Sequence, residues 1–214
     1  TTPVARYEPE RRIVMARREP DGDQIENAAR LLRAATRPIL LLGGGAVTAG
    51  CREELIGFAE RLGLPVVTTI NAKGLFPESH PQCLGMIGMY GRKSAVWALD
   101  ESDVVLALGC RFTDRITGQT DAFVRGKQII HVDVDAYELG KNVSAAIAIQ
   151  ADARLAVCAL DEVCAGFAPS DAQQWWAARA HAARGVCARC VPHEDHRGLH
   201  PKNVMDALNA ELRP

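Results

Sequence analysis

Runs of apolar residues alternate along this chain with segments that have a helical pattern. The apolar runs lie at 38–42, 65–69, 104–108, 128–135 and 145–149, and the fourth becomes acidic at its C-terminal end. Runs that are apolar on nearly every residue are typical of parallel strands buried on both faces. We therefore expect strands at these positions.

The segments between these runs place apolar residues at helical spacing. Helices are expected from Asp23 onward, at about 51–62 and 92–100, and from Asp152 to about 165, with a short helical turn at 137–141. Asp23 and Asp152 are suited to cap the helices that they precede. Alternation of this kind predicts a three-layer, Rossmann-like α/β domain, with a roughly six-stranded parallel sheet covered by helices on both faces.

This α/β pattern occupies residues 23–168, and the two ends of the chain differ from it. Residues 1–22 are polar and rich in proline, which predicts a linker from a missing N-terminal domain. Residues 169–214 predict a helical linker and the beginning of a missing C-terminal domain. Within them, a helix at 171–186 carries Ala172, Trp175, Trp176 and Ala183 on one face, and Pro201 opens a last helix with Met205, Leu208 and Leu212 aligned. Since the chain begins with Thr1 and stops at Arg213-Pro214, we expect a piece of a longer polypeptide.

The amino-acid composition and net charge limit which kinds of binding partner are expected. The 214 residues are 48% hydrophobic and 24% charged, with a formal net charge of −1. This balance argues against nucleic acid or a membrane surface as the main partner. No apolar run approaches the length of a membrane span and no signal-peptide pattern opens the chain, so a cytoplasmic location is expected. The seven cysteines are typical of reduced, partly buried thiols.

Glycines and polar residues follow three of the expected strands. They are Gly43–Gly45, Gly109–Arg115 and Asp133–Asp135. Ligands of open parallel sheets bind outside the carboxyl ends of the strands, so these residues predict a nucleotide-type ligand; the alternative is a set of unoccupied tight turns. The glycines let backbone approach the ligand, and the following helix offers N–H groups to phosphate. The fingerprint of nicotinamide dehydrogenases is absent, because Gly43–Gly45 lacks its spacing and no acid follows Thr68-Thr69.

Other residues add to this candidate site. Arg111 and Arg115 could bind phosphate or a carboxylate with Asp114 orienting one of them; a solvated ion cluster is the alternative. The glycine-punctuated segment 70–91 reads as a long functional loop in which Met86 and Met89 either wall a cofactor ring or fill gaps in the core.

Metal binding and independent catalysis are not favoured. Cys187, Cys190, His193 and His196 are metal-compatible residue types, but their short, polar spacing favours an interdomain linker over a zinc site. His131 alternates with apolar neighbours, as a satisfied core or edge histidine does. No nucleophile and base have a persuasive context, so a complete active site is not expected in this chain.

Two glycine-rich motifs carry a resemblance to a known family. They are LGMIGMYG at 84–91 and GCRFTDRITG at 109–118, and matching residues also occur at 65–69, 73–74, 130–135 and 140–143. On these residues, 24–165 resembles the central domain of the large, catalytic subunit of acetolactate synthase, a thiamine-diphosphate enzyme. The last helix, from His200 onward, looks like the beginning of that family's cofactor-diphosphate domain.

The resemblance implies an FAD site, with no catalytic or metal-binding residue in this chain. In this family the flavin does no net redox chemistry. The implied contacts are Gly43, Gly44, Gly45, Thr68 and Thr69 beside the dinucleotide backbone, Met86, Met89 and Tyr90 against the flavin, Gly109, Arg111, Asp114 and Arg115 near the ribityl chain, and Asp133, Val134, Asp152 and Ala153 at the adenosine half.

For the whole enzyme, the resemblance implies condensation of a pyruvate-derived two-carbon unit with a 2-keto acid, in branched-chain amino acid biosynthesis. Thiamine diphosphate and Mg²⁺ would be bound mainly outside this chain. The chain would contact the flanking domains of its own polypeptide, within a homodimer or homotetramer, and would be inactive alone.

Several positions depart from the family's pattern. Tyr90 stands in place of His, Thr113 in place of Asp and Cys110 in place of a small residue, and Asn71-Ala72 replaces the more usual pair. Glyoxylate carboligase and sulfoacetaldehyde acetyltransferase share this domain, and some relatives bind ADP or nothing in it. A free-standing nucleotide-binding regulatory module is a further alternative. A sirtuin-type deacylase would need a zinc module between its strands, and none is apparent.

Overall fold

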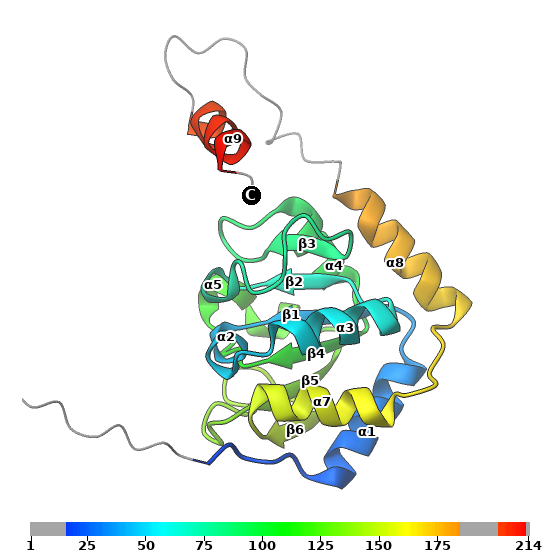
Figure 1. Ribbon diagram of the computed structural model, residues 1–214. Coiled ribbons are helices and arrows are strands. Elements are labelled where there is room, and N and C mark those ends of the chain that lie inside the picture. The colour runs from blue at the N-terminus through cyan, green and yellow to red at the C-terminus, as the bar shows by residue number, and fades with distance from the viewer. Residues whose placement is uncertain (1–15, 185–200, 213–214) are drawn as a thin grey trace, which may run out of the picture.

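The computed structural model describes residues 16–184 and 201–212, and its centre is a parallel β-sheet (Figure 1). The six strands lie side by side in the order β3-β2-β1-β4-β5-β6. Their bounds are β1 Pro38–Leu42, β2 Val66–Thr68, β3 Cys83–Met86, β4 Val104–Leu108, β5 Gln128–Asp133 and β6 Ile147–Gln150. The predicted α/β fold with about six parallel strands is confirmed.

Strand β1 lies at the centre because both of its faces are apolar. Leu40 and Leu42 face one layer of helices and Ile39 and Leu41 face the other, since successive side chains of a strand point to opposite faces. All five residues of β1 and of β4 are buried. The two strands pair in parallel, with Leu40 opposite Leu106.

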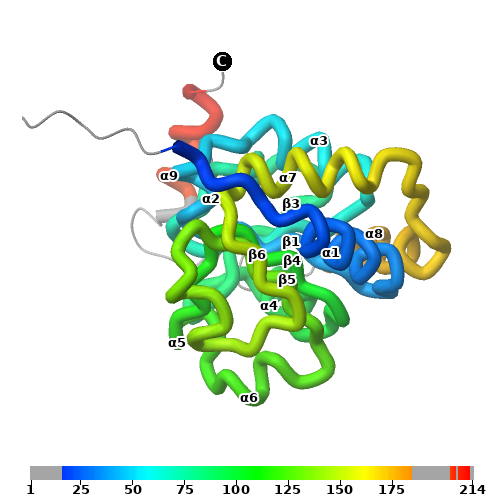
Figure 2. Tube along the Cα trace, turned by 90° about the horizontal axis from the view of Figure 1, so that it is seen from below, coloured from blue at the N-terminus to red at the C-terminus, as the bar shows by residue number. Residues whose placement is uncertain are grey.

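Helices cover the sheet in two layers, which Figure 2 shows on either side of the strands. One layer packs into the larger core cluster and contains α1 Gly22–Ala34, α2 Gly44–Ala49, α3 Arg52–Leu62 and α7 Ala153–Val163. The other layer contains α4 Lys93–Glu101, α5 Asp114–Thr117, α6 Thr120–Phe123 and α8 Asp171–Ala183. Both faces of the sheet are therefore shielded from water, as the continuous apolar runs predicted.

Strand β3 was not predicted, because its sequence lacks a strand pattern. It lies inside the segment 70–91, which we expected to be a loop, and contains Gly85 at a φ of 101°. Its pairing with β2 shifts register between Val66 and Val67. A glycine with positive φ weakens strand propensity, so contact with β2 rather than local sequence places this edge strand.

Some predicted boundaries are corrected. Helix α1 is capped by Asp21, whose Oδ1 accepts from the Gln24 N–H at 3.1 Å, so the predicted Asp23 cap is wrong. Asp152 caps α7 as predicted. The expected helix at 51–62 is α3, preceded by the separate short helix α2. The expected helical turn at 137–141 forms turns without a helix, and the short helices α5 and α6 were not predicted.

Helix α8 packs against the α/β domain. Trp176 is buried and its Nε1 donates to the Pro38 carbonyl at 2.9 Å, while Gln173 Nε2 donates to the Leu32 carbonyl at 3.0 Å. The buried face is thus Gln173, Trp176 and Ala180. The predicted face is wrong for Ala172 and Trp175, which are both exposed, Trp175 by 58%. Helix α9, Pro201–Glu211, begins at Pro201 as predicted, and the role of residues 169–214 as a connection to a further domain stays a prediction.

The backbone segments at the ends of β1 and β4 lie very close together. A Cβ built on Gly43 would lie 2.0 Å from the Gly109 carbonyl oxygen, and one built on Gly45 would lie 2.7 Å from the Gly109 Cα. The Gly43 N–H donates to the Leu108 carbonyl at 2.9 Å and the Gly45 N–H donates to the Gly109 carbonyl at 3.0 Å. Only glycine fits at these crossings.

Replacing Gly43 by Ala should therefore destabilise the fold. Because the new methyl would overlap backbone that cannot move independently, we expect a loss of about 2 kcal/mol or more in the free energy of unfolding measured with urea. The matched control is Gly57→Ala in α3, where an added Cβ meets nothing within 4 Å and better helix propensity should add about 0.5–1 kcal/mol. Equal stability of the Gly43 variant and the parent would contradict the packing described.

Candidate functional site

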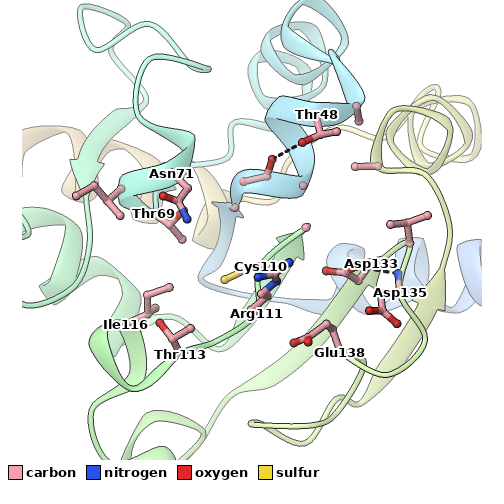
Figure 3. A pocket seen from close by; sticks show the side chains of 18 of the residues that line it. Thr48, Thr69, Asn71, Cys110, Arg111, Thr113, Ile116, Asp133, Asp135 and Glu138 are labelled. Carbon is pink, nitrogen blue, oxygen red and sulfur yellow. Dashed lines mark hydrogen bonds between the residues drawn. The ribbon is translucent and has the colours of Figure 1, made fainter. Parts of the chain in front are cut away.

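A cavity of about 890 Å³ opens at the carboxyl ends of the strands (Figure 3). It lies where the strand order reverses, between β1 and β4, which is the usual ligand position in open α/β sheets. Its lining comes from the segments that follow all six strands. The three predicted strand ends therefore do converge on one site.

The predicted contact residues line this cavity, with two exceptions. Those that line it are Gly43, Gly44, Gly45, Thr69, Met86, Met89, Tyr90, Gly109, Arg111, Arg115, Asp133, Val134, Asp152 and Ala153. Thr68 is buried in β2, where its carbonyl accepts from the Ile87 N–H at 2.9 Å. Asp114 begins α5 and lines a neighbouring cavity of about 640 Å³. Neither Thr68 nor Asp114 therefore lines the main cavity.

The N–H groups that begin α2 are mostly occupied, contrary to our expectation that they face phosphate. The N–H groups of Gly43 and Gly45 bond the end of β4, and the Ala46 N–H donates to the Gly43 carbonyl at 3.2 Å. The glycines instead give the cavity a floor without side chains. Positive charge for an anionic ligand must then come mainly from other residues.

Arg111 and Arg115 supply that charge. Both have exposed side chains that line the cavity, and neither guanidinium is ion-paired within the described part of the chain. Asp114 does not orient them as we had predicted, because its Oδ1 accepts from the main-chain N–H of Arg115 at 2.8 Å. The carbonyl of Arg111 accepts from Asn142 Nδ2 at 2.8 Å, which holds the turn after β4 in place.

The end of the cavity beside β5 and β6 is acidic. Asp133, Asp135, Glu138 and Asp152 line it, and three of these carboxylates already stabilise local backbone. Oδ1 of Asp133 accepts from the Asp135 N–H, and Oδ1 of Asp135 accepts from the Tyr137 N–H, both at 3.0 Å. These bonds fix the carboxylates at defined positions around the rim (Figure 3).

The opposite end, beside β2 and β3, is apolar and open. Its apolar lining is Ile70, Met86, Ile87, Met89 and Tyr90, of which Met89 is 72% exposed and Tyr90 is 83% exposed, and the polar Thr69 and Asn71 lie in the same segment after β2. The Met89 N–H donates to the Arg115 carbonyl at 3.2 Å, so this loop is tied to the turn after β4. The cavity is thus polarised, with an apolar end, a glycine floor and an acidic end.

Comparison with known proteins identifies the family. Residues 25–160 match the family described as thiamine pyrophosphate enzyme, central domain. The chain belongs to this family.

Acetolactate synthase large subunits are among the similar proteins. A probable one from Methanocaldococcus jannaschii is 50% identical over 131 residues, 61% of this chain and 22% of the relative. The large subunit from Corynebacterium glutamicum is 40% identical over 91% of this chain and 31% of the relative. The acetolactate synthase of Mycobacterium leprae is 41% identical over 92% of this chain and 32% of the relative. The chain therefore spans between about a fifth and a third of the length of these relatives.

Several residues of the site in this central domain escaped sequence reasoning. Arg17 and Arg18 line the cavity although we assigned them to a linker, and Thr48 and Glu138 line it as well. Nothing in the sequence around them signals a site. Cys110, noted before only as a departure from the family's pattern, lines the floor as a buried thiol, and burial raises its pKa to about 12. It is therefore a neutral group at ordinary pH.

His131 is buried beneath this site and is only partly satisfied, which corrects our expectation of a satisfied histidine. Its Nδ1 accepts from the Gly140 N–H at 3.5 Å, while its Nε2 has no hydrogen-bond partner among the described residues. Its ring packs edge-on against Phe112 with centroids 5.0 Å apart. Burial lowers the pKa of His131, with nearby Asp133 opposing the shift.

Metal ligands and membrane-spanning helices do not appear in the described residues. Within 16–184 and 201–212, no three His, Cys, Asp or Glu residues gather as a metal site would require. The candidate ligands Cys187, Cys190, His193 and His196 lie outside these residues. No helix in the same ranges is long and apolar enough to cross a membrane. The five described cysteines are free and four of them are buried.

The lowered pKa of His131 predicts a pH-dependent stability of the central domain. Because the unfolded chain binds this proton more readily, stability is full above the ordinary histidine pKa of about 6.5 and falls as pH drops below it. The free energy of unfolding should therefore decrease from pH 7.5 to 5.5, and it should decrease less in His131→Gln. Urea titrations at both pH values measure this. An identical decrease in the variant would show that His131 does not carry the effect.

Proposed function

We propose that this central domain binds FAD, extended across the strand ends. The observation that carries the proposal is the polarised cavity, which is apolar at one end and acidic at the other with a glycine floor between. The volume of about 890 Å³ lies near the upper end of the usual range for ligand pockets, as a dinucleotide requires. A smaller, uniformly polar ligand would leave much of this cavity unfilled.

The flavin ring would lie against the apolar end. Met86, Met89 and Tyr90 offer thioether and aromatic surface there, and both groups pack well against a flat ring. The exposure of Met89 and Tyr90 supports this, because a bound ring would cover apolar surface that now faces water.

The pyrophosphate would lie over the glycine floor near Arg111. The absence of side chains at Gly43, Gly44 and Gly45 lets the ligand approach the backbone, and the guanidinium of Arg111 can donate charge-assisted hydrogen bonds to phosphate oxygens. The adenosine would then reach the acidic end. Ribose hydroxyl groups donate well to carboxylates, and Asp133 is the carboxylate held closest to the end of β5.

We further propose that the whole enzyme is an acetolactate-synthase-like carboligase that condenses a pyruvate-derived unit with a 2-keto acid. The similarity to acetolactate synthase large subunits supports this. Thiamine diphosphate would supply the carbanion chemistry, held with Mg²⁺ mainly outside this chain. The central domain would bind the flavin and contact the flanking domains of its own polypeptide, in a cytoplasmic homodimer or homotetramer.

ADP in place of FAD is the second candidate ligand. The observation that favours it is the acidic end of the cavity, where hydrogen bonds already fix the carboxylates of Asp133 and Asp135 as an adenosine site would require. Glyoxylate carboligase and sulfoacetaldehyde acetyltransferase remain alternative whole-enzyme activities, because Tyr90, Cys110 and Thr113 depart from the acetolactate synthase pattern.

Titration of the chain with FAD and with ADP tests which of the two nucleotides binds in the cavity. Flavin fluorescence or calorimetry should show saturable FAD binding, and Asp133→Ala should weaken it by about 1–3 kcal/mol, the cost of losing a hydrogen bond to a charged group. Asp133→Asn keeps an acceptor for the Asp135 N–H and should lose less. Asp121→Ala, on α6 outside the cavity, is the control. ADP binding without FAD binding would favour the second candidate.

An activity assay tests whether the carboligation reaction requires the flanking domains. The chain supplied with FAD, thiamine diphosphate, Mg²⁺ and pyruvate should form no acetolactate, because in this proposal the flanking domains bind and activate thiamine diphosphate. A larger polypeptide containing this domain and its flanking domains should form it. Acetolactate production by the isolated chain would refute the assignment of catalysis to the other domains.

A further inference from the structure

Residues Ala16–Arg18 run along the acidic end of the cavity, and we call them the N-terminal strap. All three line the cavity together with Asp152. Arg18 makes two hydrogen bonds that hold the strap. Its carbonyl accepts from the N–H of Asp152, the N-cap of α7, at 2.9 Å, and its Nε donates to the carbonyl of Gln150, the last residue of β6, at 3.0 Å. The strap is thus part of the site although it precedes the first helix.

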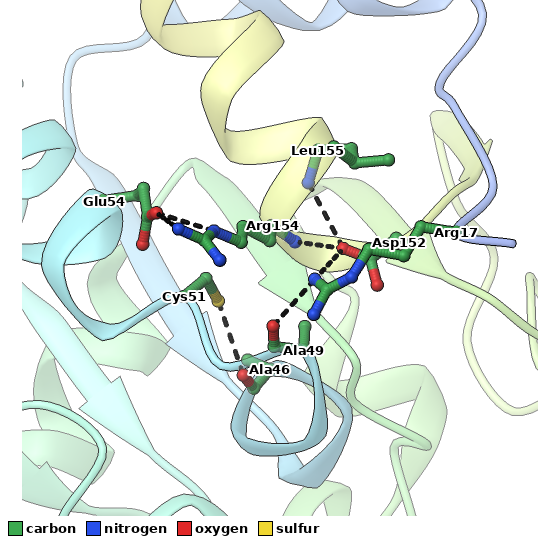
Figure 4. A network of polar contacts seen from close by, with 8 residues as sticks. All are labelled: Arg17, Ala46, Ala49, Cys51, Glu54, Asp152, Arg154 and Leu155. Carbon is green, nitrogen blue, oxygen red and sulfur yellow. Dashed lines mark hydrogen bonds and ion pairs between the residues drawn. The ribbon is translucent and has the colours of Figure 1, made fainter. Parts of the chain in front are cut away.

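Arg17 links this strap to two helix ends (Figure 4). Its guanidinium donates to the carbonyl of Ala49, the last residue of α2, at 2.8 Å and to Oδ1 of Asp152 at 3.1 Å. A cation is favourable at a helix C-terminus, and the same oxygen of Asp152 caps α7 by accepting from the N–H groups of Arg154 and Leu155. One side chain therefore braces both walls at this end of the cavity.

The walls themselves are fixed without the strap. Arg154 is ion-paired with Glu54, with its Nε 2.6 Å from Oε1, which ties α7 to α3. The thiol of Cys51 donates to the Ala46 carbonyl at 3.4 Å, which holds the junction of α2 and α3. Removing Arg17 should accordingly loosen the strap, which would keep only the two hydrogen bonds of Arg18, and leave the helices in place.

The exposure of these groups favours a role in ligand binding over one in stability. The Arg17 side chain is 46% exposed and that of Asp152 is 15% exposed. An ion pair whose arginine is nearly half exposed contributes little stability, because water screens it. A ligand at the acidic end would exclude this water and strengthen the pair.

We infer that the N-terminal strap closes over the adenosine end of the bound nucleotide, with Arg17 as the positioning residue that holds the strap against α2 and α7. This inference rests on the proposed nucleotide site and adds a segment to it. The strap would affect ligands that contain adenosine and leave contacts at the apolar end unchanged.

Arg17→Ala in the 214-residue chain tests this inference, with ADP, FAD and FMN as probes. We expect ADP and FAD affinity to fall by about tenfold, because a loosened strap no longer covers the adenosine end, and any FMN affinity to stay unchanged. Arg17→Lys should recover part of the loss. The matched control is Arg33→Ala, since Arg33 also donates to a carbonyl of α7, that of Val163 at 2.6 Å, away from the cavity. Unchanged ADP and FAD affinity in Arg17→Ala would overturn the inference.

Amide hydrogen exchange of the ligand-free chain separates this inference from the proposed function. The Asp152 N–H, which donates to the strap, should exchange faster in Arg17→Ala and at the parental rate in Arg33→Ala. If the parent bound neither ADP nor FAD, the proposed nucleotide site would fail and the strap would lose its ligand. Unchanged exchange at Asp152 would instead show that Arg17 does not hold the strap, whatever the cavity binds.

Discussion

The structure depends on the close approach of two backbones where β1 and β4 end. Gly43, Gly45 and Gly109 let these strand ends cross at distances that no side chain permits, and the hydrogen bonds between them replace the phosphate contacts that such glycines usually suggest. The crossing lies where the strand order reverses. The floor of the cavity lacks side chains for the same reason that the two strand ends can approach each other, so the fold and the proposed ligand site both require glycine at these positions.

The polarity of the cavity follows from the order of the strands. Segments after β2 and β3, on one side of the sheet, supply most of the apolar side chains of the lining, while those after β5 and β6 on the other side carry carboxylates. A long ligand laid across the strand ends therefore meets a different chemistry at each end. Arg111, on the central turn, lies between them (Figure 3). Sheet topology thus sets the orientation of the ligand that we propose.

Sequence predicted the features that local pattern controls. The buried strands, most helices and the convergence of the glycine and acidic turns followed from apolar runs and from the parallel arrangement that they imply. Prediction from the sequence failed where contacts between distant segments determine the structure. Strand β3 forms through its pairing with β2. The buried face of α8 is selected by hydrogen bonds to the carbonyls of Pro38 and Leu32. Arg17 reaches the site only because the chain before α1 returns to α7.

Helix α8 has a mechanical consequence. Through Trp176, it is bonded to the carbonyl of Pro38, the first residue of the central strand, and Gln173 bonds the end of α1. A pulling force applied to α8 would therefore load β1 at the end opposite the cavity, together with the segment before β3, to which Arg184 donates at the carbonyls of Glu78 and His80. Detaching the helix would expose the Trp176 indole and leave two carbonyls without these partners. In this molecule, α8 behaves as a tether anchored in the sheet rather than as a loose connector.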